Sequence, residues 1–152
     1  MGLTNSRPVR WGMALWVGLL AADALAYAGF TLNYKLGFST EHYPYPPNIA
    51  LLKLTPLWDP ILTLAAGMAL LLAVVLILRR KRVALEAIVA PFIVLLLLFA
   101  IRVSRPESGI LHSLSTVYQE SPFAMIWPIA GLAITVLICL ALWRDRQKPA
   151  PR

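Results

Sequence analysis

Four long apolar stretches, nearly free of charged residues, divide this chain of 152 residues. They cover approximately residues 11–34, 60–78, 83–101 and 122–143. A helix needs about 20 apolar residues to cross the hydrocarbon core of a bilayer, and each stretch is close to that length or longer. The pattern predicts an all-α integral membrane protein in which four transmembrane helices form a bundle.

The segments between the stretches are short. Residues 35–59 and 102–121 form two loops that share one side of the membrane, and residues 145–152 are predicted to be a disordered tail. Since none of these segments is long enough for a soluble core, residues 1–152 are predicted to form a single membrane domain. The composition agrees, because only 14% of the residues are charged, whereas soluble chains have about 25%.

The basic residues lie mostly on one side of the predicted bundle. Ten flank the termini and the turn between the second and third stretches: Arg7, Arg10, Arg79, Arg80, Lys81, Arg82, Arg144, Arg146, Lys148 and Arg152. Four lie on the other side: Lys35, Lys53, Arg102 and Arg105. This asymmetry predicts cytoplasmic termini in a multi-pass plasma membrane protein of the bacterial inner-membrane type. The net charge of +7 therefore indicates topology and contact with membrane lipids, and no nucleic-acid motif accompanies it.

Local signals predict where helices begin and which faces meet. Asp59-Pro60 and Ser121-Pro122 each place a capping residue before a first-turn proline, which predicts the starts of the second and fourth spans. Small residues recur every four positions in the first span, at Ala14, Gly18, Ala22 and Ala26. Such a ridge favours close helix packing, whereas the third span has no comparable ridge and is expected to be the most exposed.

The second loop and the N-terminal segment each carry a further signal. Residues 110–118 alternate apolar and polar positions with a helical period, which predicts a short amphipathic helix at the outer membrane interface. Arg7, Arg10 and the apolar run that ends in Ala24-Leu25-Ala26 also resemble a secretory signal peptide. Because the apolar run continues to about Phe30, an uncleaved first helix is the favoured interpretation.

Asp23 is the one acidic residue inside the first apolar stretch. A carboxylate at that depth costs about 2.5–3.5 kcal/mol on insertion scales, so it usually faces a partner or a water-filled cavity. Tyr27 follows four residues later on the same helix face, and Arg102 ends the third stretch on the same side of the membrane. We therefore predict a bundle-facing Asp23 with Tyr27 and Arg102 as partners. Both a ligand- or proton-coupling site and a structural contact between helices remain open.

The other polar candidates are weaker. Glu86 lies one turn inside the third stretch, four residues after Arg82, and a surface ion pair explains it. His42 and His112 fall in separate loops without metal-ligand spacing, so we predict solvated histidines and no metal site. The single Cys139 excludes an intrachain disulfide and a dithiol redox pair.

Function remains at the level of classes, because no catalytic or phosphate-binding motif and no family resemblance is found. The scarcity of polar groups in the spans favours a non-catalytic subunit of an electron-transfer or transport complex, with partners at the third span and outer loops. One alternative is a lipid- or isoprenoid-binding protein or enzyme with a pocket near Asp23. Another is a small oligomeric transporter that uses Asp23. No cofactor is predicted, although contact with lipid or quinone is compatible with the sequence.

Overall fold

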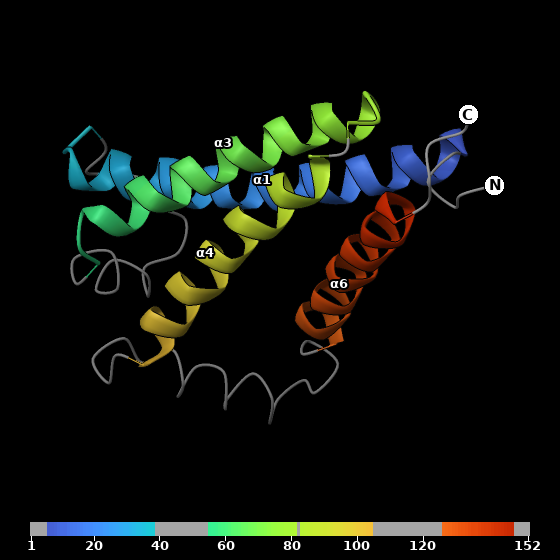
Figure 1. The fold of residues 1–152 in the computed structure, drawn as a ribbon. Helices are drawn as coiled ribbons and strands as arrows, with labels where there is room; N and C mark the ends of the chain where they lie inside the picture. Colours follow the sequence, from blue (N-terminus) through green and yellow to red (C-terminus); the bar gives the residue numbers. More distant parts are fainter. Residues whose placement is uncertain (1–5, 39–54, 82, 105–125, 148–152) are drawn as a thin grey trace.

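The computed structural model describes residues 6–38, 55–81, 83–104 and 126–147, and the regular structure in these ranges is α-helical (Figure 1). The helices are α1 (Arg7–Lys35), α3 (Trp58–Leu78), α4 (Ala84–Ser104) and α6 (Ile126–Arg146). The predicted interfacial helix at residues 110–118, the Ser121-Pro122 cap and the C-terminal residues 148–152 lie outside the described ranges.

Three of these helices, α1, α3 and α4, are long and apolar enough to cross a membrane. At about 1.5 Å per residue, the 21 residues of α3 or α4 span about 32 Å, close to the thickness of the hydrocarbon core. The structure therefore confirms that the regular structure of the described residues is all-helical and that three of the helices could cross a membrane, as expected of a multi-pass membrane protein. A fourth span in α6, the direction of the chain and the identity of the membrane stay predictions.

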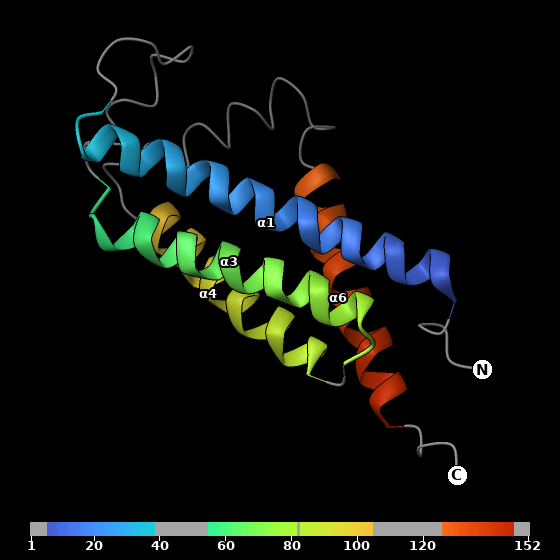
Figure 2. The ribbon, with the colours of Figure 1, turned by 90° about the horizontal axis from the view of Figure 1, so that it is seen from above.

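The antiparallel helices α1 and α3 form the most extensive contact of the fold, and they lie side by side in Figures 1 and 2. Both bury residues at alternating spacings of three and four. The buried positions of α1 are Met13, Ala14, Val17, Ala21, Ala24, Ala28 and Thr31. The buried positions of α3 are Asp59, Pro60, Thr63, Ala66, Gly67, Leu70, Ala73 and Ile77. Alternation of three and four keeps a seam on one face of a helix, as in coiled-coil packing.

The predicted ridge of small residues in α1 was only partly correct. Ala14 is buried and Gly18 is half-buried, but Ala22 and Ala26 are exposed. The physical reason is that a step of four residues turns about 40° beyond a full rotation, so a strict four-residue ridge drifts around the helix. Besides Ala14, the buried small residues on α1 are Ala21, Ala24 and Ala28. Ala21 lies against Gly67 of α3, where small residues allow the two helices to approach closely.

Gly67 marks the tightest point of the α1–α3 contact. A Cβ atom added to Gly67 would lie 2.9 Å from Cγ and Cδ2 of Leu25 and 3.4 Å from the carbonyl oxygen of Ala21. Because Gly67 has no side chain, the backbone of α3 can pack directly against the Leu25 side chain of α1.

The basic turn between α3 and α4 ends α3 with a Schellman motif. The Lys81 N–H donates to the Leu76 carbonyl at 2.9 Å, and the Arg80 N–H donates to the Ile77 carbonyl at 3.1 Å. Arg80 has a φ of 56°, a left-handed conformation that this motif requires and that glycine adopts most easily. The geometry reverses the chain within a few residues, so α4 packs directly against α3.

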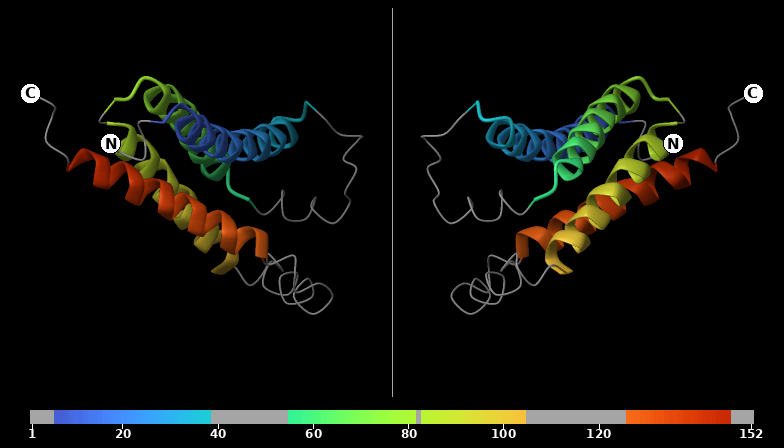
Figure 3. Two further views of the ribbon diagram at one scale, coloured as in Figure 1. Left: turned by 90° about the vertical axis from the view of Figure 1, so that its right-hand side faces the viewer. Right: turned by 90° about the vertical axis from the view of Figure 1, so that its left-hand side faces the viewer.

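The helices α4 and α6 cross the α1–α3 pair obliquely (Figures 1 and 3). The apolar part of α4 is 22% buried, against 33% in both α1 and α3. The prediction that the third span is the most exposed was nevertheless wrong, because α4 buries four residues, whereas α6 buries only Thr135 and Ile138 in the part whose burial is described. α6 contacts α4 and α1 less extensively than α3 does. One polar contact fixes α6 on α1, because the Trp16 Nε1–H donates to the Thr135 hydroxyl at 3.0 Å.

Candidate functional site

A buried ion pair joins α3 to α4 near the start of α3. Asp59 is completely buried, and its carboxylate accepts three hydrogen bonds from Arg102. Arg102 Nη2 lies 2.5 Å from Oδ1 of Asp59, and Arg102 Nε lies 2.9 Å from Oδ2. The guanidinium thus donates hydrogen bonds to both carboxylate oxygens, and this arrangement fixes the relative position of the two side chains.

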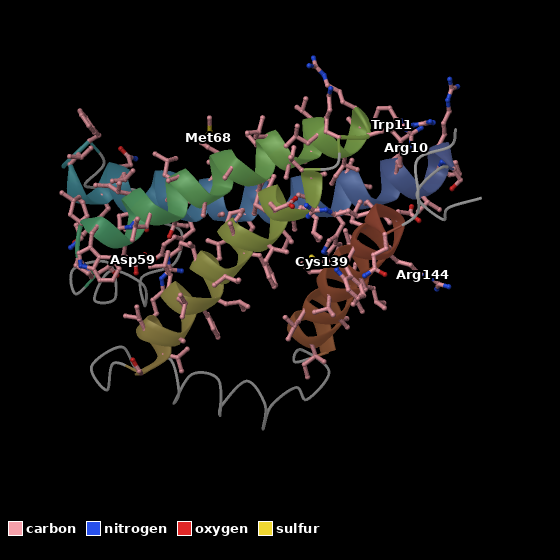
Figure 4. All side chains as sticks on the ribbon, in the orientation of Figure 1. Arg10, Trp11, Asp59, Met68, Cys139 and Arg144 are labelled. Carbon is pink, nitrogen blue, oxygen red and sulfur yellow. The ribbon has the colours of Figure 1, made fainter. Side chains whose placement is uncertain are left out.

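Two more side chains complete what we call the Asp59 cluster: Asp59, Thr63, Arg102 and Tyr27. Arg102 Nη2 donates to the Thr63 hydroxyl at 2.7 Å, and that hydroxyl donates to the Asp59 carbonyl at 2.9 Å. The guanidinium carbon of Arg102 lies 4.1 Å from the centre of the Tyr27 ring on α1, a cation–π contact. The cluster therefore links three helices, and Figure 4 shows Asp59 at the N-terminal end of α3.

The local sequence explains why Asp59 is available to Arg102. α3 begins at Trp58, one residue before Asp59, and Leu57 precedes it without a side-chain cap. The prediction that Asp59 caps α3 was therefore wrong: Asp59 lies in the first turn, where the helix dipole favours a carboxylate, and its side chain is engaged by Arg102 on α4. Pro60 fits the same turn because first-turn N–H groups have no partner within the helix.

Asp23 lies elsewhere, and the prediction that it faces the bundle was wrong. Its side chain is exposed, and within the described ranges no ion pair or hydrogen bond involves it. Of the predicted trio, the structure brings together Tyr27 and Arg102, while Arg102 takes Asp59 as its acidic partner. Tyr27 points toward α4 because it lies about 40° further around α1 than Asp23. A ligand- or proton-coupling role of Asp23 stays a prediction.

Glu86 forms an ion pair with Arg146 of α6 at the opposite end of α4. Both side chains are 51% exposed. The predicted partner, Arg82, lies outside the described residues. The sequence indicated an ion pair within one helix, and the structure shows an ion pair between α4 and α6. The pair connects α4 with α6 but offers no enclosed site.

The remaining candidates give no metal centre in the described part of the chain. His42 and His112 lie outside it, and among residues 6–38, 55–81, 83–104 and 126–147 no cluster of three potential ligands occurs. Cys139 is a half-buried free thiol on α6 (Figure 4).

An open apolar groove separates α4 from α6, with a volume of about 420 Å³. We call it the α4–α6 groove, and its lining consists of Leu85, Phe92, Thr135, Val136, Cys139, Leu140 and Trp143. The Thr135 hydroxyl is already engaged by Trp16 and by the Gly131 carbonyl. The groove therefore suits a hydrocarbon chain rather than a polar substrate.

The chemistry of the Asp59 cluster is structural. A general acid or base must reach a substrate proton, yet Asp59 is fully buried and both of its carboxylate oxygens are held by Arg102. The sequence signal for this pair is the position of Asp59 and Arg102 at the same predicted side of the membrane, which the competing Asp23 obscured. No protein family, curated protein or solved structure matches the chain.

Proposed function

We propose that the chain is a non-catalytic subunit of a larger membrane complex and docks through the face of α1 around Asp23. The observation that carries this proposal is a contrast between acidic side chains. Asp59 and Glu86 each pair with an arginine of the chain, whereas Asp23 is exposed without a partner among the described residues. A partner subunit that covers this face would remove the carboxylate from lipid.

The arrangement of the other polar groups supports a scaffold rather than an enzyme. The Asp59 cluster and the Trp16–Thr135 hydrogen bond hold helices together. In both, the polar side-chain atoms are engaged in hydrogen bonds between helices. These contacts stabilise the α1–α3–α4 packing and fix α6 on α1, and so present the exposed face of α1 in a defined orientation. The electron-transfer or transport character of the complex rests on the sequence alone.

Photo-crosslinking in native membranes tests the proposal. A photoreactive residue at Ala26, which lies on the exposed face of α1, should crosslink to one protein in a fixed stoichiometry. The same residue at Leu72, which is 58% exposed on α3, is the matched control and should crosslink mainly to lipid. The crosslinked partner should also remain with the chain through extraction in mild detergent.

Two outcomes would contradict a subunit role. One is a chain that leaves the membrane as a stable monomer; the other is a crosslinking pattern that is the same at Ala26 and Leu72.

The α4–α6 groove favours a second candidate, a protein that binds lipid or isoprenoid chains. Its walls are apolar, and its open side admits a chain from the bilayer. A photoactivatable acyl or isoprenoid chain should then label Phe92 in the groove more strongly than the exposed Leu97 of α4. Equal labelling of both positions would identify the groove as ordinary lipid-facing surface.

A further inference from the structure

We propose that the Asp23 face of α1 binds a transmembrane helix that carries a basic side chain at the depth of Asp23. This inference rests on the proposed function and specifies the chemistry of the partner. We define the Asp23 face as the exposed residues Leu19, Ala22, Asp23, Ala26 and Phe30.

The depth of Asp23 requires a partner within the membrane. Asp23 lies about 24 Å along α1 from Arg7 and about 18 Å from Lys35, at about 1.5 Å per residue. The long side chains of lysine and arginine reach the membrane interface from inside a span, but the aspartate side chain has a single methylene. Its carboxylate therefore stays at the apolar depth of the helix, where an unpaired charge is unfavourable.

The chain itself supplies no cation to this face in the described helices. α1 has no basic residue between Arg10 and Lys35. Arg102, the basic residue predicted to reach Asp23, is held by Asp59, Thr63 and the Tyr27 ring. Since its internal candidate is engaged elsewhere, the carboxylate is complementary to a lysine or arginine on another helix.

The residues beside Asp23 favour a helix as the occupant. Ala22 and Ala26 flank the carboxylate and have small side chains, so a partner backbone can approach closely. Leu19 and Phe30 are 56% and 59% exposed, and they border the small residues with larger apolar surface. Charge complementarity then selects among apolar helices the one that places a cation opposite Asp23.

A reconstituted system with defined peptides tests this inference. The probe is a synthetic leucine–alanine transmembrane peptide with one central lysine, and the matched peptides carry leucine or glutamine there. Purified chain with Cys139→Ser and a fluorophore at Gln147→Cys is mixed with labelled peptide in phosphatidylcholine vesicles, and energy transfer reports association. We expect the lysine peptide to bind at least tenfold more tightly than the leucine peptide.

Substitutions in the chain separate charge from shape. Asp23→Asn should reduce binding of the lysine peptide to the level of the leucine peptide, and Asp23→Glu should preserve most of the difference. Glu86→Gln, which alters an exposed acid outside the Asp23 face, should leave binding unchanged.

Several results would overturn the inference: equal binding of the lysine and leucine peptides, equal binding of the lysine and glutamine peptides, or unchanged binding by Asp23→Asn. Asp23-dependent association of the chain with itself, without peptide, would assign the face to a second copy and would also overturn it. These outcomes are independent of the crosslinking at Ala26. A stoichiometric partner with no preference for the lysine peptide would retain the subunit role and reject the basic helix.

Discussion

The two ion pairs of α4 lie at opposite ends of the helix and differ in burial. Arg102 binds a completely buried carboxylate with three hydrogen bonds and also contacts a threonine and an aromatic ring. Glu86 and Arg146 are each about half exposed and form a single hydrogen-bonded ion pair with each other. Burial and the number of satisfied hydrogen bonds, rather than the presence of opposite charges, therefore decide how strongly an ion pair fixes two helices.

The largest effect is expected from removal of one partner of the buried pair. Arg102→Leu leaves the Asp59 carboxylate buried without a cation, and it should lower the free energy of unfolding by about 3–5 kcal/mol. Unfolding in mixed detergent and sodium dodecyl sulfate, followed by circular dichroism, measures the change. The double substitution Asp59→Leu/Arg102→Leu removes both charges and should recover most of the loss. If Arg102→Leu lowers the free energy of unfolding no more than Glu86→Gln does, the proposed difference in strength between the two ion pairs is wrong.

The threonine of the cluster should give the next largest effect. Thr63→Val keeps the shape of the side chain but removes the oxygen that accepts from Arg102, and a hydrogen bond to a charged group contributes about 1.5–3 kcal/mol. Thr31→Val is the matched control, since its buried hydroxyl donates to the Tyr27 carbonyl of its own helix. That control should cost about 0.5–1 kcal/mol in the same unfolding measurement. Equal costs for the two variants would show that Arg102 does not depend on Thr63.

The cation–π contact should contribute less. Tyr27→Leu removes the ring beneath Arg102 and should cost about 0.5–2 kcal/mol, while Tyr27→Phe keeps the ring and should be close to neutral. A double-mutant cycle with Arg102→Leu isolates the interaction, because the cost of Tyr27→Leu should fall once the guanidinium is absent. If Tyr27→Leu costs the same free energy of unfolding in the Arg102→Leu background, Tyr27 contributes only apolar packing and no cation–π interaction.

The exposed pair should give the smallest effect. Glu86→Gln should change the free energy of unfolding by about 0–1 kcal/mol, because solvent screens both charges. Any cost should shrink as salt increases, whereas the cost of Arg102→Leu should depend little on salt. Unfolding titrations at low and high ionic strength compare the two, and a salt-independent cost above about 2 kcal/mol for Glu86→Gln would contradict the contrast.

The secondary structure was largely predictable because hydropathy acts on each helix separately. The apolar stretches at 11–34, 60–78 and 83–101 correspond to α1, α3 and α4 within a few residues at each end. The turn at Arg79–Arg82 was predicted from its charges, but the left-handed Arg80 was not, since the sequence has no glycine there to mark the motif. The positions of the helix ends were therefore predicted more reliably from composition than the backbone geometry of the caps was.

The candidate site was only partly predictable, because residue contacts depend on the rotation of each helix about its axis. Tyr27 and Arg102 do meet, but the acid between them is Asp59 rather than Asp23. Asp23 and Tyr27 are four residues apart, and the angle of about 40° between them is enough to separate an exposed side chain from one that contacts Arg102. Small residues such as Ala21 and Gly67 set that rotation through close packing of α1 on α3.

The helical character and the lengths of the apolar segments follow from the amino-acid sequence, which also marks Asp23 as an unusual residue within a span. These properties follow from the transfer of each segment into an apolar environment, which depends on local composition. The pairing of Arg102 with Asp59 and the exposure of Asp23 on the surface of α1 arise only when the helices pack together. The pairing depends on which faces of α1, α3 and α4 pack together. Those faces are set by the sum of all contacts between the helices and not by any one segment.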